Sequence, residues 1–333
     1  MGGSFISDNR EFDSASNKVR TVVLVGRTGN GKSATGNSIL GRRAFNSKSS
    51  FDGVTKTTEL QRTVLDDGQV LNVIDTPGLF DKAADPQFVE KEIVRCIGMA
   101  KDGIHAVLVV VSLRSRVSME EAAAIETLQK IFGDKIAEYM ILVFTGGDEL
   151  EDDEVNFDDY LSRSESIKGM LKLCGNRRVL FDNRTKNAAK KAEQLKQLLF
   201  LVDDVVVKNG GKPYTNELFD EFKKAAAKLR DQAKELNSLS KEEKIEREMQ
   251  MYQSYDEHMK RITGMVEKMI TDTRSRLEQQ LKDEKDARLR AEAAAREAQL
   301  KSDEEIRNLR KRLEESQKEI QRLKDDDGGC QIL

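Results

Sequence analysis

The segment Gly26–Ser33, with the sequence GRTGNGKS, constrains the fold more than any other part of the chain. It matches the pattern G-x-x-x-x-G-K-[ST] and lies between an apolar stretch that ends at Val25 and a helical stretch that runs through Ile39. In this context glycines let backbone N–H groups wrap around phosphates, the lysine reaches the terminal phosphates, and the serine hydroxyl can bind Mg²⁺. The expected phosphate-binding residues are Gly26, Arg27, Thr28, Gly29, Asn30, Gly31, Lys32, Ser33 and Ala34.

Short β-rich apolar runs alternate with helical stretches over residues 19–212. Such alternation predicts an α/β domain in which a mostly parallel sheet is covered by helices on both faces. Residues 1–18 are expected to form a disordered leader, and residues 328–333 a flexible tail. The strands are expected at Thr21–Val25, Thr63–Leu65, Val70–Ile74, Ala106–Val111, Met140–Phe144 and Val179–Phe181.

The composition changes after the breaker at residues 209–213, and residues 213–327 favour helix. No proline occurs between Asn216 and Asp327, and Gly264 is the one glycine there. Two interpretations of this region are open: an extended oligomerising coiled coil, or a helical hairpin folded onto the first domain. The expected coiled-coil seam positions are Met259, Ile262, Val266 and Met269, then Ile306, Leu309, Leu313, Ser316, Ile320 and Leu323, with a weak heptad between the two sets.

Composition excludes several classes of function. Charged residues make up 35% of the chain, but the net charge is only −3, which does not favour general binding to nucleic acid. Three cysteines and two separated histidines give neither a disulfide framework nor zinc-type spacing. No apolar run is long enough to span a bilayer, so any membrane contact is expected to be peripheral and the setting cytosolic. Cys96 and Cys174 are interpreted as buried side chains, and His105 as a packed histidine or, alternatively, a general base.

A second motif follows the third expected strand. Asp75-Thr76-Pro77-Gly78 comes directly after Val70–Ile74. An aspartate at the end of a buried strand can hold Mg²⁺ through water, and the glycine N–H can contact a γ-phosphate. Together with the phosphate loop, this motif indicates GTP rather than ATP, so the expected ligands are GTP or GDP and Mg²⁺.

Base recognition is expected after the Met140–Phe144 strand, which leads into Thr145, Gly146, Gly147 and Asp148. Asp148 is placed to accept two hydrogen bonds from guanine, which adenine cannot offer with the same polarity. The common GTPase pattern N-K-x-D is absent, so part of the base clamp must come from elsewhere, and Asn183 is the candidate. The use of ATP instead would leave Asp148 without a role in binding.

These segments resemble a known family. The segments GRTGNGKSATGNSILG, SFDGVTKTTEL, DTPGLFD, FTGGDEL and RVLFDNRTKN, together with the stretch from Gly103 to Gly133, are similar to the immunity-associated nucleotide-binding GTPases, the GIMAP/IAN or AIG-type family, plant-like branch. The resemblance covers about residues 19–235. It implies a Ras-like domain with an added helical element, Ser47 beside the nucleotide, and Thr55 as the switch threonine that binds Mg²⁺, with Thr57 and Thr58 as alternatives.

An isolated copy of the chain is expected to hydrolyse GTP slowly, if at all. The residue after Gly78 is Leu79, where Ras-type enzymes have the glutamine that orients the attacking water. The resemblance implies that G domains pair across their nucleotides, with Arg116 as an arginine finger supplied to the partner and Arg114 as its neighbour. Such a finger can increase the rate by about 10³ to 10⁵. Alternatively, Arg116 forms an ordinary surface ion pair, and the protein is a nucleotide-stabilised scaffold with negligible turnover.

The last four residues, Cys330 to Leu333, match the C-a-a-X prenylation pattern, and a final leucine favours a geranylgeranyl group on Cys330. Residues 325–327 are three aspartates, in place of the basic patch that would otherwise strengthen the membrane binding of a single lipid. A coiled-coil dimer would present two lipids together. The sequence thus predicts a homodimer or oligomer that lies on a cytosolic membrane face, with clients that it does not identify.

Overall fold

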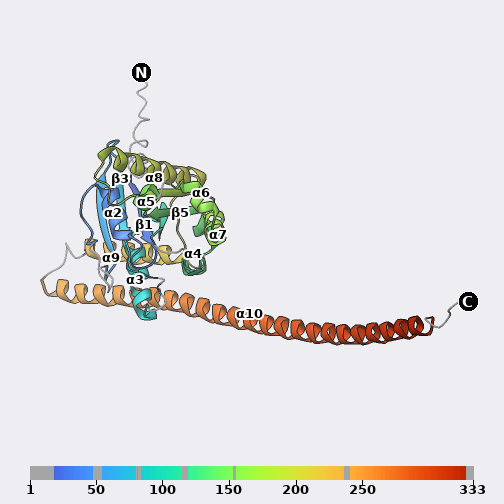
Figure 1. Cartoon of the computed structure of the whole chain (residues 1–333). Helices are drawn as coiled ribbons and strands as arrows, with labels where there is room; N and C mark the ends of the chain where they lie inside the picture. Colours follow the sequence, from blue (N-terminus) through green and yellow to red (C-terminus); the bar gives the residue numbers. More distant parts are fainter. Residues whose placement is uncertain are drawn as a thin grey trace, which may run out of the picture. The chain divides into compact units, whose positions relative to one another are not determined.

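The computed structural model describes residues 19–47, 55–79, 81, 84–114, 119–152, 155–235 and 241–327. Its centre is a six-stranded sheet with the strand order β2-β3-β1-β4-β5-β6 (Figure 1). All neighbouring strands are parallel except β2 and β3, which are antiparallel. The mostly parallel sheet predicted from the sequence is confirmed. The strands are β1 (Val19–Val25), β2 (Glu59–Val64), β3 (Val70–Asp75), β4 (Ala106–Ser112), β5 (Met140–Thr145) and β6 (Arg178–Phe181).

Burial follows each strand's place in the sheet. All seven residues of β4 are buried because this central strand is covered on both faces. Strand β2 lies at the edge, and its Leu60 and Val64 are exposed. The sequence predicted the second strand at Thr63–Leu65, which is too short and too late. An edge strand with so few buried residues gives only a weak apolar pattern.

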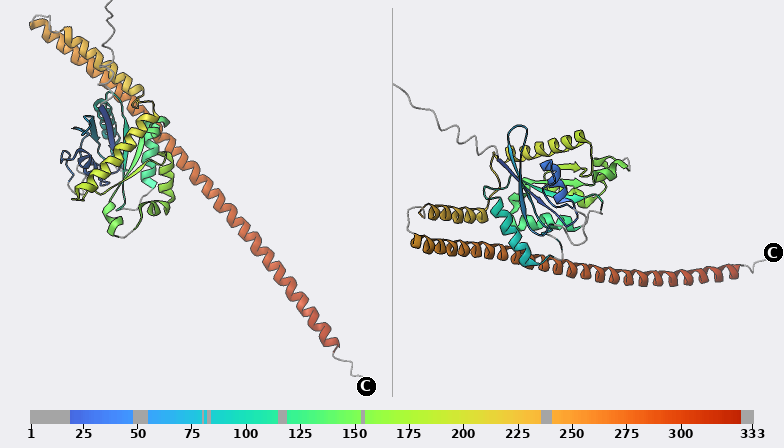
Figure 2. Two further views of the ribbon diagram at one scale, coloured as in Figure 1. Left: turned by 90° about the horizontal axis from the view of Figure 1, so that it is seen from above. Right: turned by 90° about the vertical axis from the view of Figure 1, so that its left-hand side faces the viewer.

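Helices cover both faces of the sheet (Figures 1 and 2). Helices α2 and α8 contact each other and the sheet on one face. On the other face, α3 and α4 pack with Val23 and Val25 of β1 around Cys96, which is buried. Cys174 is buried as well, as predicted. The helices of this part are α2 (Lys32–Leu40), α3 (Pro86–Met99), α4 (Met119–Phe132), the 3₁₀ helix η1 (Asp134–Tyr139), α5 (Gly147–Asp152), α6 (Phe157–Ser162), α7 (Glu165–Leu173) and α8 (Ala188–Lys208).

The helical region consists of α9 (Glu217–Glu235) and α10 (Lys241–Asp327). Phe222 of α9 lies against Gly98 of α3. Ile262 and Val266 of α10 are fully buried in the same hydrophobic core as the sheet. The earlier of the two predicted seams therefore packs onto the first domain, as the hairpin interpretation expects.

The chain forms two compact units, residues 1–273 and 274–333, so the first unit takes in the start of α10. Beyond Thr273, α10 continues as one helix to Asp327, through the stretch where the heptad is weak. Alanine and charged residues there have high helix propensity, and ion pairs four residues apart, such as Arg288 with Glu292, add support. Leu309, Leu313 and Ile320 of the later seam are exposed. No helix in the described ranges is long and apolar enough to cross a membrane.

His105 is packed at the start of β4, at the opposite end of the strand from the carboxyl edge of the sheet. The backbone N–H of Thr21 donates to His105 Nδ1 at 3.0 Å, so this nitrogen is an acceptor and the ring is neutral. Burial, with a smaller effect of the Arg20 charge, lowers the pKa of His105 to about 4. This geometry agrees with a packed histidine and gives no support to a general base.

We expect His105 to make stability depend on pH. Its folded-state pKa lies below the unfolded value of about 6.5, so the unfolded state binds more protons as the pH falls below 6.5. The free energy of unfolding should fall by up to about 1.4 kcal/mol per pH unit between pH 6.5 and 5. Urea unfolding of the wild type and of His105→Gln, which keeps an acceptor but does not titrate, should show a smaller pH slope for the variant. Equal slopes would contradict the assignment.

Candidate nucleotide-binding site

The site lies where the carboxyl ends of the parallel strands meet. Strand β3 lies on one side of β1 and β4 lies on the other. The strand order therefore reverses at β1, which leaves a crevice beside the end of that strand. A pocket of about 450 Å³ opens there. Of the residues predicted from the sequence, its walls include Thr28 to Ala34, Ser47, Thr55, Gly78, Thr145, Gly146, Asp148 and Asn183.

The phosphate loop is tightly held under the pocket. Gly26 has a φ of +145°, and a Cβ atom there would lie 2.5 Å from the carbonyl oxygen of Val110, so only glycine fits this approach to β4. Lys32 is only 5% exposed, and its Nζ donates to the carbonyls of Gly26 at 2.8 Å and Arg27 at 2.9 Å. Burial lowers the pKa of Lys32 to about 8, against the opposing charges of Asp75 and Asp81.

Three oxygen-bearing side chains converge beside Lys32. Ser33 Oγ donates to Asp75 Oδ2 at 2.6 Å and lies 2.9 Å from Thr55 Oγ1, which is 3.4 Å from the same carboxylate oxygen. Asp75 Oδ1 is buried without a hydrogen-bond partner among the described residues. Burial raises the pKa of Asp75 to about 6, although the bond from Ser33 and the charge of Lys32 oppose the shift. Hydroxyl and carboxylate oxygens are the ligands that Mg²⁺ prefers, so these residues fit that ion.

The three candidate switch threonines separate in the structure. Thr55 lies in the oxygen cluster, while Thr57 is exposed. Thr58 is buried, and its N–H and hydroxyl both bond to Glu92 of α3. The geometry therefore favours Thr55 for the role that the resemblance implies.

Thr145, Asp148 and Asn183, which the sequence predicts to lie beside the base, all line the pocket, and we call this part its base half. The Thr145 hydroxyl donates to the carbonyl of Asn30 at 2.7 Å and so joins the end of β5 to the phosphate loop. The amide of Asn183 donates to Thr35 Oγ1 at 3.0 Å and accepts from Ser38 Oγ at 2.8 Å, both on α2. Asn183 is thus fixed at the wall of the pocket.

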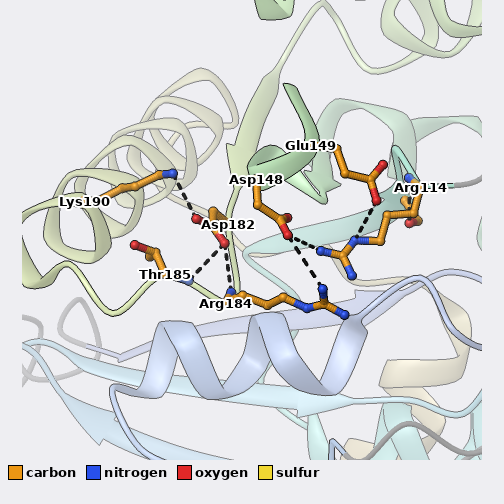
Figure 3. A network of polar contacts seen from close by, with 8 residues as sticks. Arg114, Asp148, Glu149, Asp182, Arg184, Thr185 and Lys190 are labelled. Carbon is orange, nitrogen blue, oxygen red and sulfur yellow. Dashed lines mark hydrogen bonds and ion pairs between the residues drawn. The ribbon is translucent and has the colours of Figure 1, made fainter. Parts of the chain in front are cut away.

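The Asp148 carboxylate lies among arginines (Figure 3). Arg114 Nη2 donates to Asp148 Oδ2, and Arg184 Nη1 lies 3.9 Å from the same oxygen. The loop that carries Arg184 is held by Asp182, which accepts from the N–H groups of residues 184 and 185 and pairs with Lys190 at 2.9 Å.

Some residues predicted for the site are not wall residues of the pocket or lie outside the described part of the chain. Gly26, Arg27, Asp75 and Gly147 support the pocket and are not among its wall residues. Arg27 forms an ion pair with Glu121 of α4 at 3.4 Å. Arg116 and Cys330 lie outside the described residues. Four further wall residues were not predicted for this pocket from the sequence: Asn46, Ser112 at the end of β4, Arg114 and Arg184.

The part of the chain that forms the pocket matches a known protein family. The model described as the AIG1 family matches residues 20–233. The chain belongs to the AIG1 family. The family resemblance seen in the sequence is therefore confirmed, and with it a GTP-binding domain of the AIG1 type.

Relatives of this AIG1 chain are found in Arabidopsis thaliana. The immune-associated nucleotide-binding protein 9 is 53% identical over 335 residues, which cover 99% of this chain and 98% of that protein. The immune-associated nucleotide-binding protein 4 is 43% identical over 286 residues, covering 84% of this chain and 87% of that protein. Among solved structures, Toc33 from Arabidopsis thaliana in complex with GDP and Mg²⁺ aligns with a TM-score of 0.48 and 23% identity, covering 60% of this chain and 89% of that one.

Proposed function

We propose that this AIG1 protein is a guanine-nucleotide switch that binds GTP with Mg²⁺ and slowly hydrolyses it to GDP. The observation that carries the proposal is that one pocket joins three parts: the phosphate loop with Lys32, the oxygen cluster around Asp75, and the Asp148 carboxylate. Ser33, Thr55 and Asp75 would hold Mg²⁺, which supplies positive charge to the phosphates when bound. Lys32 would contact the terminal phosphate oxygens.

Slow hydrolysis follows from the residue after Gly78. The Leu79 side chain is 6% exposed and packs in the hydrophobic core, where it can neither contact nor orient an attacking water. We propose that a second copy of the chain supplies the missing group through Arg116. Association of two copies is supported by the exposed seam at Leu309, Leu313 and Ile320.

Nucleotide binding and turnover should be measured separately on the full chain. The switch proposal expects GDP and GTP to bind in the presence of Mg²⁺, ADP and ATP to bind far more weakly, and phosphate release per molecule to rise with protein concentration. Equal binding of ADP would contradict guanine specificity. Tight guanine binding with turnover near zero at every concentration would favour the second candidate, a nucleotide-stabilised scaffold. The buried Leu79 also favours the scaffold, because a leucine cannot orient an attacking water.

Membrane attachment is a separate proposal that rests on the pattern Cys330 to Leu333 alone. We propose that Cys330 carries a geranylgeranyl group and holds the protein on a cytosolic membrane face. Intact-mass measurement of protein from a eukaryotic host should show the mass of this group, and the shift should be absent in Cys330→Ser. An unmodified mass for the wild type would remove the anchor.

A further inference from the structure

The base half of the pocket lacks the lysine of the pattern N-K-x-D, and its position is occupied by Gly146. With Asp148 at the last position of the pattern, Thr145, Gly146 and Gly147 stand at the first three. Gly146 has a φ of +87°, and a Cβ atom there would lie 3.2 Å from Arg114 Cγ and 3.4 Å from Arg114 Nε. The stem of Arg114 therefore lies over the backbone from which a lysine at residue 146 would extend.

The register of β4 and β5 brings Arg114 to this place. Ser112 pairs with Thr145, and the N–H of Leu113 donates to the carbonyl of Thr145 at 2.9 Å. The N–H of Arg114 then donates to Ser112 Oγ at 3.2 Å. Residue 114 leaves its strand beside residues 146–148, although more than thirty positions separate them in the sequence.

The Arg114 guanidinium is fixed at two carboxylates (Figure 3). Nη2 pairs with Asp148 Oδ2, and Nε lies 3.4 Å from Glu149 Oε1. The Arg114 and Asp148 side chains are 31% and 27% exposed, so the pair is partly shielded from water. Arg184 approaches the same oxygen only to 3.9 Å and its side chain is 71% exposed, which makes it the weaker partner.

The Asp148 carboxylate keeps hydrogen-bond acceptor positions that no residue in the described part of the chain uses. Asp148 Oδ1 is buried and has no hydrogen-bond partner within the described ranges. A carboxylate has about four acceptor positions, and the bond from Arg114 uses one of them on Oδ2. Oδ2 can therefore accept an N–H donor from the guanine edge while Arg114 stays in place, because Asp148 lines the pocket and its side chain is 27% exposed.

We propose that Arg114 is a positioning residue for guanine specificity: its guanidinium holds the Asp148 carboxylate in the orientation that accepts from the guanine edge, and its stem takes the place of the absent lysine beside the base. This inference rests on the proposed function, because it concerns the base of the nucleotide that the pocket binds. Arg114 then acts within its own chain and is not available to a partner's nucleotide.

The test compares GDP with IDP, whose base lacks the amino group that guanine gives to the carboxylate. A hydrogen bond to a charged group contributes about 1.5 to 3 kcal/mol, so the wild type should prefer GDP by roughly 10- to 100-fold. Arg114→Met keeps an apolar stem and loses the guanidinium, and the preference should fall about tenfold. Arg114→Ala loses the stem as well and should also weaken the binding of both nucleotides. Arg114→Lys, with one point charge, should give an intermediate preference.

Arg178→Met is the matched control. Arg178 lies on β6, pairs with Asp158 at 2.8 Å and is not a wall residue of the pocket. Its GDP preference should equal that of the wild type. In an Asp148→Ala background, Arg114→Met should no longer change the preference. Folded Arg114→Met or Arg114→Lys protein with the wild-type preference would overturn the inference. Failure of the wild type to bind either nucleotide would instead overturn the proposed function.

Discussion

Replacing Lys32 with methionine should weaken GDP binding by about 10² to 10³-fold. The Lys32 ammonium reaches into the loop from the first turn of α2 and is held by two loop carbonyls, so it is already oriented where phosphates would bind. A lowered pKa of about 8 still leaves Lys32 mostly protonated at neutral pH. Methionine fills a similar volume without the charge, and the loss of charge-assisted bonds to the terminal phosphate oxygens accounts for about 3 to 4 kcal/mol.

Affinity should be measured by calorimetric titration of the full chain with GDP and Mg²⁺. Lys168→Met is a suitable control, because Lys168 pairs with Glu165 on the surface of α7, and it should bind GDP like the wild type. The folded state of Lys32→Met is checked by its thermal unfolding, since removal of a buried charge need not destabilise the domain. A folded variant with an affinity within about threefold of the wild type would show that Lys32 does not contact the phosphates.

Much of the fold could be predicted because the central strands carry a strong local signal. Strand β4, for example, is apolar from Ala106 to Val111. The helical region was less predictable for a physical reason. The spacing of Ile262 and Val266 identifies one apolar face of a helix, but the same face could pack against a second helix or, as it does, against the core of the first domain.

The candidate site divides in the same way. The phosphate loop is contiguous in the sequence, so its residues and their chemistry could be predicted together. The contact between Arg114 and Asp148 depends on the pairing register of β4 and β5. Local sequence does not specify that register, although Gly146, in place of a lysine, showed that part of the base clamp had to come from elsewhere.

Replacing Arg116 with alanine should abolish the rise of GTP turnover with protein concentration and leave GDP affinity unchanged. An arginine supplied by a partner can accelerate hydrolysis by about 10³ to 10⁵, so the rate of the variant should stay at the value of the dilute wild type. The proposal makes Arg116, rather than its neighbour Arg114, the group that reaches the partner. The structure gives a reason for this choice, because Arg114 is bound to Asp148 and Glu149 within its own chain.

The two arginines can therefore be distinguished by a crossed experiment. Arg116→Ala should change the concentration dependence of turnover and not the preference for GDP over IDP, whereas Arg114→Met should change that preference while the stimulation of turnover by concentration persists at saturating GTP. Phosphate release at saturating GTP is measured over a series of protein concentrations for both variants and the wild type. If Arg114→Met loses the stimulation and Arg116→Ala keeps it, the two roles are reversed. If neither variant loses it, stimulation does not come from these arginines, and another group of the partner must act on the nucleotide.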